Sequence, residues 1–361
     1  MADYHFKRCA KVQNYLDREK LDAALVTSEV NVRWLTGFTG GDAALLVLPE
    51  RWVLLSDSRF TLQIPKECPG LEFAMRAETG LFGLAAKLLP KGNLRLAIEA
   101  DAVTLAQAET IQKHVDAELV PMKSLIERFR AIKDKYEIAA LREAARIARN
   151  AFNGVCAGLT PDKTEKQIAD ELDFGMRQLG ATRAGFPTIT AVGANAAFCH
   201  AVPGPTRVAE DDFLLVDWGA EYNGYTSDLT RTVVTGRLTR KFQTLYTLVL
   251  EAQQAAINAI RPGERCCEIH HVARRVLAAQ KCDKYFTHGL GHSVGLQIHE
   301  SPTFSPYCET VLKPGMVLTV EPGVYIKGWG GIRIEDDILV TRDGCEVLTD
   351  AAKELEQIIL R

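Results

Sequence analysis

The stretch that decides the fold is LLVDWGAEYNGYTSDLTRT, residues 214–232. Its apolar start and its Asn223-Gly224 pair predict a β-hairpin, because Asn-Gly is favoured in two-residue hairpin turns. Side chains alternate between the two faces of a strand. A two-residue turn at this pair, or one residue earlier, therefore puts Asp217 and Asp228 on the same face, directly opposed or one diagonal apart. We expect their side chains to lie within about 4.5–8 Å of each other.

Two carboxylates this close are unfavourable unless one of them is protonated or a cation lies between them. The alternative interpretation is a pair of exposed acids on a solvated hairpin, since acidic residues are mostly found on surfaces. Other groups in the chain must distinguish a cation site from an ordinary surface.

The composition is that of a soluble globular protein. The chain has 361 residues, 47% of them hydrophobic and 25% charged, which is enough for two domains. A net charge of −3 without a basic run disfavours nucleic acid as a partner. No stretch approaches the roughly 18 apolar residues of a membrane span, and no apolar leader is seen. Nine cysteines without a CxxC pair favour free thiols, and we expect a cytoplasmic location.

The order of expected elements divides the chain into two domains. Strands and helices alternate in residues 1–128, which predicts a small α/β domain. A polar, basic segment near residue 130 is the expected boundary. In residues 131–361 a helix pair followed by strands occurs twice, which indicates two similar halves. Thr160, followed by Pro161, is the expected N-cap of the second helix of the first pair.

Three further groups of polar residues follow the hairpin. Residues 288–300 read HGLGHSVGLQIHE, and glycines at this density let the backbone approach a neighbour closely. In LTVEPGVY, Glu321 ends an apolar strand. In GGIRIEDDILV, alternation places Arg333 and Glu335 on the face opposite two isoleucines. A turn centred on Gly328 would set Glu321 and Glu335 opposite each other.

Four carboxylates and one imidazole form a hard, oxygen-rich set of ligands. Structural zinc sites prefer Cys and His, whereas this set favours Mn²⁺, with Fe²⁺ and Co²⁺ as alternatives. Four carboxylates carry too much charge for one divalent ion and match two. Such a pair of ions lowers the pKa of a water molecule and supplies hydroxide near neutral pH.

Four segments, VDWGAEYNGYTSDLTRT, HGLGHSVGLQIHE, TVEPGVY and GIRIEDDILV, resemble the motifs of the pita-bread metallopeptidases. This family includes methionine aminopeptidase, Xaa-Pro aminopeptidase (aminopeptidase P) and Xaa-Pro dipeptidase (prolidase). The front part, with NVRWLTGFTGG and SDSRF, resembles the creatinase/prolidase N-terminal domain, which methionine aminopeptidases usually lack. The resemblance implies an α/β (α+β) fold, with a C-terminal pita-bread catalytic domain of two pseudo-twofold halves and a smaller N-terminal α/β domain. It also implies a homodimer whose contacts involve the N-terminal domain.

The resemblance implies two divalent metal ions, with Mn expected and Co, Fe or Zn possible. The implied ligands are Asp217, Asp228, His292, Glu321 and Glu335. Asp228 and Glu335 resemble the ligands that bridge the two ions. Glu321 resembles a residue with a second task, the transfer of the proton of the attacking water, for which a carboxylate beside that water is suited.

Four further residues resemble groups around the metal ligands. His200 and His299 resemble two histidines that donate hydrogen bonds to the substrate carbonyl and its tetrahedral intermediate. His288 and Arg333 resemble groups that face the substrate or support the ligands. The alternative for all four is that they only orient the metal ligands.

The resemblance implies peptide substrates with proline in the second position. Proline lacks an N–H and has a fixed ring, so the pocket must accept a compact apolar group. Phe186 and Tyr225 are candidates for its wall, with core packing as the alternative.

The length of the substrate depends on recognition of a free carboxylate. Some prolidases carry Arg in HE-x-P-R, where it can bind the carboxylate that follows proline, but this chain has Thr303 at that place. We therefore expect an Xaa-Pro aminopeptidase, with an Xaa-Pro dipeptidase as the alternative. A creatinase-like or non-catalytic peptide- or protein-binding relative is a remote third interpretation, because such relatives have broken ligand sets.

Overall fold

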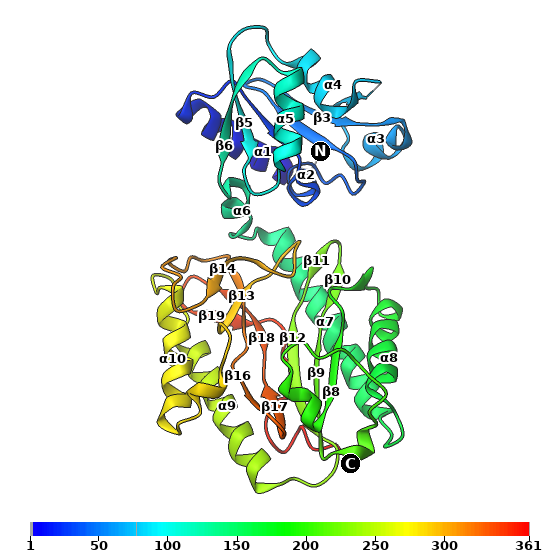
Figure 1. Cartoon of the computed structure of the whole chain (residues 1–361), viewed down its shortest axis with the longest axis vertical. Helices are drawn as coiled ribbons and strands as arrows, with labels where there is room; N and C mark the ends of the chain where they lie inside the picture. The colour runs from blue at the N-terminus through cyan, green and yellow to red at the C-terminus, as the bar shows by residue number, and fades with distance from the viewer. Residues whose placement is uncertain (1–2, 77, 361) are drawn as a thin grey trace. The chain divides into compact units, whose positions relative to one another are not determined.

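The computed structural model describes residues 3–76 and 78–360 and separates into two compact units, Met1–Arg130 and Ala131–Arg361. Figure 1 shows the elements of each unit. None of the helices in the described residues is both long enough and apolar enough to cross a membrane.

Unit 1 is a six-stranded mixed sheet with the strand order β4-β3-β2-β1-β5-β6. Its buried core lies between the sheet and the helices α4 and α5. The strands are β1 (Ala23–Val26), β2 (Ala44–Val47), β3 (Trp52–Ser56), β4 (Glu72–Met75), β5 (Leu94–Glu99) and β6 (Ala117–Met122). The helices are α1 (Asp3–Glu19), α2 (Glu29–Thr36), α3 (Gln63–Glu67), α4 (Gly80–Leu88), α5 (Leu105–His114) and α6 (Leu125–Arg130), with a 3₁₀ turn η1 (Ser58–Phe60).

Unit 2 begins with a helix pair that covers a set of antiparallel strands. The helices are α7 (Lys135–Ala157) and α8 (Glu165–Gln178). The strands are β7 (Arg183–Ala184), β8 (Ile189–Val192), β9 (Phe213–Trp218), β10 (Ala220–Tyr222), β11 (Tyr225–Thr226) and β12 (Leu229–Val234), with 3₁₀ turns η2 (Gly193–Ala197) and η3 (Val208–Glu210). They pair in the orders β12-β9-β8 and β11-β10-β7.

The second part of unit 2 repeats this order of elements. Its helices are α9 (Arg240–Ala259) and α10 (Cys266–Ala279), followed by the 3₁₀ turn η4 (Asp283–Tyr285). Its strands are β13 (Gly291–Ser293), β14 (Glu300–Phe304), β15 (Val317–Val320), β16 (Gly323–Ile326), β17 (Gly330–Arg333), β18 (Asp336–Val340) and β19 (Cys345–Val347). Figure 1 shows the two helix pairs on opposite sides of the strands, and one continuous core joins all four helices to both sets of strands.

One expected helix start is wrong. Helix α8 begins at Glu165, and its N-cap is Thr164 rather than Thr160. The Thr164 side chain accepts a hydrogen bond from the Gln167 N–H, and the Gln167 side chain accepts one from the Thr164 N–H. This capping box satisfies two backbone donors at once, which a cap at Thr160 would not do.

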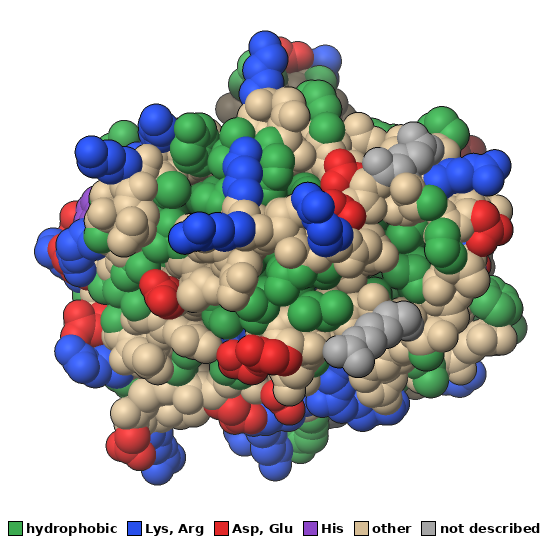
Figure 2. All heavy atoms as spheres, turned by 90° about the horizontal axis from the view of Figure 1, so that it is seen from below, with side chains coloured by type: hydrophobic (Ala, Val, Ile, Leu, Met, Phe, Trp, Pro, Cys, Tyr) green, Lys and Arg blue, Asp and Glu red, His purple; other side chains and the backbone are tan. Residues whose placement is uncertain are grey.

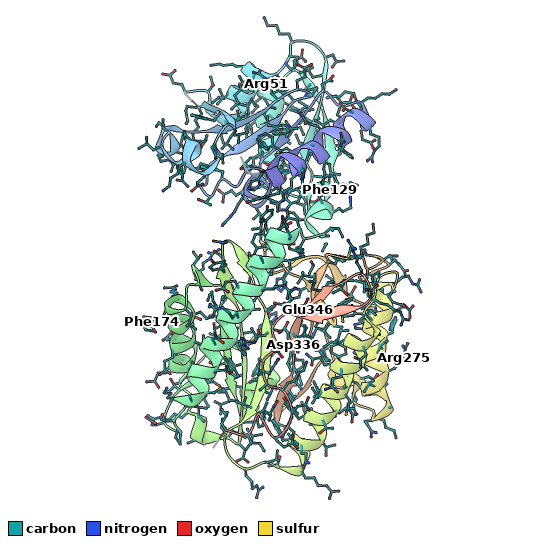
Figure 3. All side chains as sticks on the ribbon, turned by 180° about the vertical axis from the view of Figure 1, so that it is seen from behind. Arg51, Phe129, Phe174, Arg275, Asp336 and Glu346 are labelled. Atoms are coloured by element: carbon teal, nitrogen blue, oxygen red, sulfur yellow. The ribbon has the colours of Figure 1, made fainter. Side chains whose placement is uncertain are left out.

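A buried ion pair joins the two sets of strands. Arg231 on β12 donates to Asp336 on β18 at 2.8 Å, and both side chains are fully buried. Lys353 donates to the other oxygen of Asp336 at 2.6 Å. Burial alone would raise the pKa of Asp336, but Arg231 and Lys353 hold it below its usual value. Figure 3 shows Asp336 in the interior of unit 2, whereas Phe174 on α8 and Arg275 on α10 lie at its outer sides.

The Asp336→Asn variant tests how much this pair matters for stability. An amide of the same shape leaves the buried Arg231 and the half-buried Lys353 without an anion, so we expect the free energy of unfolding to fall by about 3–5 kcal/mol. Urea denaturation in EDTA measures this without a contribution from metal binding. The control is Glu346→Gln, which removes an exposed ion pair with Arg142 and should cost less than about 1 kcal/mol. Equal losses in the two variants would contradict this account.

Candidate metal centre

The first hairpin has the predicted turn. Asn223 and Gly224 form a two-residue turn between β10 and β11, and both have positive φ, 51° and 85°. The continuing ladder pairs Asp217 with Thr230. Asp228 is therefore one diagonal away from Asp217 on the same face, which confirms the prediction from alternation.

The second pair of strands brings the two glutamates together. Strand β15 pairs with β18, and β16 pairs with β17, in one continuous register. Glu321 and Glu335 lie at the two junctions and face each other in that register. The register is centred on Gly328, which confirms the predicted centre of the turn. The φ of Gly328 is 76°.

His292 lies on β13, close to the backbone of β15. A Cβ atom on Gly291 would lie 2.0 Å from the carbonyl oxygen of Thr319, so only glycine allows this approach. The pairing of β13 with β14 is irregular between His292 and Ser293, and such irregularities change the direction of a side chain. Nδ1 of His292 contacts the Ser293 carbonyl oxygen at 3.2 Å. Because a carbonyl only accepts, Nδ1 carries the proton and Nε2 keeps its lone pair.

These residues converge on one point inside unit 2. Ligand atoms of Asp228, His292 and Glu335 all lie within 4.8 Å of one another. Nε2 of His292 is 3.5 Å from Oδ2 of Asp228 and 3.5 Å from Oε1 of Glu321. Asp217 is next to them across the β9–β12 ladder. The structure thus brings together all five residues that the sequence singled out as ligands.

A chain of hydrogen bonds supports Asp217 from behind. Arg333 Nη2 donates to Asp217 Oδ2 at 2.5 Å, and Arg333 Nη1 donates to the Tyr325 hydroxyl at 2.8 Å. The Tyr325 hydroxyl is 3.0 Å from Nε2 of His288, whose Nδ1 contacts the Gly289 carbonyl at 2.7 Å. The directions of donation are consistent if His288 is neutral. In this structure Arg333 holds the Asp217 side chain directly, and His288 does so through Tyr325.

Sequence reasoning missed three residues of this network. Tyr325 lies in the chain just described. The Thr230 hydroxyl donates to Glu335 Oε2 at 2.6 Å, and Asp337 accepts from the Asp228 N–H at 2.9 Å. Strand alternation could have found Thr230, two residues after Asp228 and hence on the same face.

His200 and His299 both have exposed side chains beside this cluster. The ring centroid of His299 is 4.5 Å from that of His292. His200 follows Cys199, whose carbonyl oxygen is 3.4 Å from Arg333 Nη1. Both histidines are thus at the solvent side of the cluster.

The two residues considered for a proline pocket have different surroundings. Tyr225 is buried in an apolar cluster, and its hydroxyl donates to Glu137 at 3.0 Å, so core packing describes it. Phe186 is half-buried and lies against the junction of β9 and β10, where a Cβ atom on Gly219 would be 2.9 Å from its ring.

Both parts of the chain match models of known protein families. Residues 139–342 match the model of metallopeptidase family M24, and residues 8–132 match the creatinase/prolidase N-terminal domain. The chain belongs to metallopeptidase family M24. The expected family, its two-domain architecture and its hydrolase class are confirmed.

Similar proteins are named either Xaa-Pro dipeptidase or X-Pro aminopeptidase. A solved Xaa-Pro dipeptidase from Bacillus anthracis is 36% identical with a TM-score of 0.93, covering 99% of this chain and 100% of that one. An Xaa-Pro dipeptidase from Pyrococcus furiosus is 34% identical over 360 residues, 97% of this chain and 99% of that protein. A solved X-Pro aminopeptidase from Thermotoga maritima is 29% identical with a TM-score of 0.87, covering 93% and 97% of the two chains.

The donor set of this M24 metallopeptidase fits divalent metal ions. Oδ1 of Asp217 is buried and has no hydrogen-bond partner among the described residues, which is costly unless something binds it. The donors are mostly carboxylate oxygens with one imidazole, as hard divalent ions prefer. Arg333 offers one positive charge to the cluster, which does not balance its acids.

Burial and mutual repulsion change the protonation of the metal-free metallopeptidase. Burial, followed by repulsion from Glu335 and Asp217, raises the pKa of Asp228. Burial raises the pKa of Glu321 to about 8, although Arg333 acts in the opposite direction. Burial also lowers the pKa of His288 and of His292 to about 4, so both rings are neutral near pH 7.

These shifts predict how pH changes the stability of the metal-free metallopeptidase. A carboxyl with a raised pKa keeps a proton that the unfolded chain releases, so stability falls as pH rises toward the folded-state pKa of about 8 for Glu321. The histidines act in the opposite sense, but their contribution is nearly complete at about pH 7. We therefore expect the melting temperature in EDTA to fall between about pH 7 and pH 8.

Differential scanning fluorimetry with and without EDTA measures this effect. Added Mn²⁺ should raise the melting temperature and remove its decline with pH, because ligands that bind the metal are already deprotonated. A melting temperature in EDTA that rises with pH over this range would show that the buried carboxyls are not protonated.

Proposed function

We propose that this chain is a metal-dependent Xaa-Pro dipeptidase that uses two divalent ions. The observation that carries the proposal is the convergence of four carboxylates and one imidazole inside unit 2. The names of the relatives from B. anthracis and P. furiosus, which align over nearly the whole chain, support the dipeptidase activity. They favour the dipeptidase over the aminopeptidase that Thr303 had suggested.

The five converging residues would hold the two ions, with Asp228 and Glu335 as the bridging ligands. When bound, two divalent ions polarise the substrate carbonyl and supply hydroxide near neutral pH. Mn²⁺ is our proposed metal because oxygen ligands dominate the set. Co, Fe and Zn are the alternatives.

Glu321 is the residue that we assign to proton transfer. Its carboxylate is at the inner edge of the cluster, 3.5 Å from His292 Nε2, and accepts a hydrogen bond from the Thr319 hydroxyl at 3.3 Å. A carboxylate in this position can take a proton from the attacking water and pass it to the leaving nitrogen. The leaving nitrogen needs that proton because proline nitrogen is a poor leaving group without it.

His200 and His299 are the residues that we assign to the substrate carbonyl. Their rings are on the exposed side of the cluster, where a peptide can approach. An N–H from either ring can stabilise the negative charge that develops on the carbonyl oxygen. Arg333, Tyr325 and His288 would meanwhile keep Asp217 in place.

Xaa-Pro aminopeptidase is the second candidate, and one observation favours it. Thr303 pairs with His292 across the β13–β14 ladder and has an exposed side chain. Position 303 is therefore beside the cluster but offers no cation for a terminal carboxylate.

The homodimer, the cytoplasmic location and the absence of a nucleic-acid partner stay predictions from the sequence. On the face in Figure 2, Lys and Arg side chains are interspersed with Asp and Glu.

Substrate length separates the two candidates. We expect the Mn²⁺-loaded enzyme to hydrolyse Ala-Pro and to leave Ala-Pro-Ala nearly intact, measured by chromatography of the products. Pro-Ala, in which proline is not in the second position, is the negative control. Preferential cleavage of the tripeptide would establish the aminopeptidase instead, and cleavage of neither would reject both.

The Glu335→Gln variant tests the metal site directly. The amide lacks the negative charge and one acceptor oxygen, so we expect fewer bound ions per chain after dialysis, measured by plasma mass spectrometry. Loss of a bridging ligand should lower kcat by more than about 100-fold, which is roughly 3 kcal/mol. Glu309→Gln, an exposed change away from the cluster, should alter neither value. Full metal content in Glu335→Gln would remove Glu335 from the ligand set.

A further inference from the structure

His200 is carried by a loop that joins β8 to β9. We name residues 193–206 the His200 loop; it begins with η2 and includes Phe198 and Val202, whose side chains are 69% and 87% exposed. Most of this loop has no strand or helix to hold it in place. The position of His200 therefore depends on the contacts that hold the ends and the middle of the loop.

Glu165 makes those contacts at both ends of the His200 loop. Its carboxylate is 1% exposed. It accepts a hydrogen bond from the Val192 N–H at 2.7 Å and from Asn195 Nδ2 at 2.8 Å, where the loop begins. It also accepts one from the Gly204 N–H at 2.9 Å, where the loop ends. The Glu165 N–H donates to the Thr206 carbonyl at 2.9 Å.

Capping of its own helix does not explain this carboxylate. Thr164 and Gln167 already form the capping box of α8. A buried carboxylate is expensive to desolvate, and an apolar side chain would pack at lower cost unless the three donors need an acceptor. The position of Glu165 thus indicates that its carboxylate holds the two ends of the loop together.

The other side of the His200 loop contacts Arg333, the residue that holds Asp217 in the carboxylate cluster. Turn η2 packs against β17, and Arg333, at the end of β17, donates to the Cys199 carbonyl at 3.4 Å. Arg333 also holds Asp217. The loop is therefore fixed between Glu165 and Arg333, with His200 directly after the residue that Arg333 contacts.

We propose that Glu165 is a positioning residue that places His200 against the substrate carbonyl by holding both ends of the His200 loop. This inference rests on the proposed peptidase function, because it assigns His200 the work described above. The printed contacts of the Glu165 carboxylate are with the loop and its start rather than with the carboxylate cluster.

The Glu165→Gln variant tests the proposal. The amide keeps one acceptor oxygen but turns an NH₂ toward a backbone N–H, so one end of the loop loses its partner. We expect kcat for the Xaa-Pro substrate to fall about 10- to 100-fold, as misplacement of a catalytic group does, with little change in KM or in bound metal. The control is Glu171→Gln on the same helix, whose carboxylate is partly exposed and bonded to Lys163. That variant should behave as the wild type.

A double-mutant cycle separates positioning from a general loss of structure. If Glu165 acts through His200, Glu165→Gln should lower kcat no further once His200→Ala is present. Losses that multiply in the double variant would overturn the proposal. Asn195→Ala, which removes one donor to Glu165, serves where Glu165→Gln does not fold. It should show the same non-additivity with a smaller loss.

Hydrogen exchange distinguishes failure of this inference from failure of the proposed function. In Glu165→Gln, amide exchange in residues 193–206 should be faster by at least about tenfold, whereas exchange in β12 should not change. If exchange in the loop is unchanged, the inference is wrong whatever the substrate is. If exchange increases but the wild type cleaves no Xaa-Pro peptide, the assigned function of His200 is wrong and the inference falls with it.

Discussion

Repulsion among closely placed carboxylates is the constraint on which unit 2 depends. Asp217, Asp228 and Glu335 are buried and face one another without enough positive charge from the chain to balance them. Folding must hold this unfavourable cluster before metal binds. Two strand ladders do this, because their registers fix which way the acidic side chains point. The buried Arg231–Asp336 ion pair joins the two ladders. The carboxylate cluster thus lowers the stability of unit 2, and the strands around it offset that cost.

Alternation explains why so much of the cluster could be predicted from the sequence. In a strand the facing of a side chain depends only on parity, so a turn of known length fixes which residues face each other. The Asn223-Gly224 turn and the loop centred on Gly328 supply that length for both pairs of acids. The meeting of the two pairs depends on packing between β12 and the residues before β18, for which the sequence carries no local signal. Ligand chemistry suggested that the two pairs act together, and the resemblance to a family supported it, but neither gives the contacts between them.

The residues that the sequence did not reveal act through tertiary contacts. Tyr325 lies four residues after Glu321 and could pass for a core aromatic, yet its hydroxyl joins Arg333 to His288. Tyr225, a candidate for the pocket, belongs to the core through Glu137. Thr160 and Thr164 are equally good caps by residue type, and the Gln three residues later decides between them. In each case the partner of the side chain, rather than its type, defines its role.

The proposed metal centre would account for hydrolysis but leaves the choice of peptide length to other groups. Relatives with the two different names share the backbone fold over nearly the whole chain, so the fold cannot separate a dipeptidase from an aminopeptidase. The difference must lie in a cation that binds the carboxylate after proline, or in a surface that admits further residues. Arg333 is not free for this task because Asp217 and Tyr325 occupy it. On the proposed function we therefore expect the length preference to be set outside the five expected ligands, by side chains on the exposed side where His200 and His299 lie.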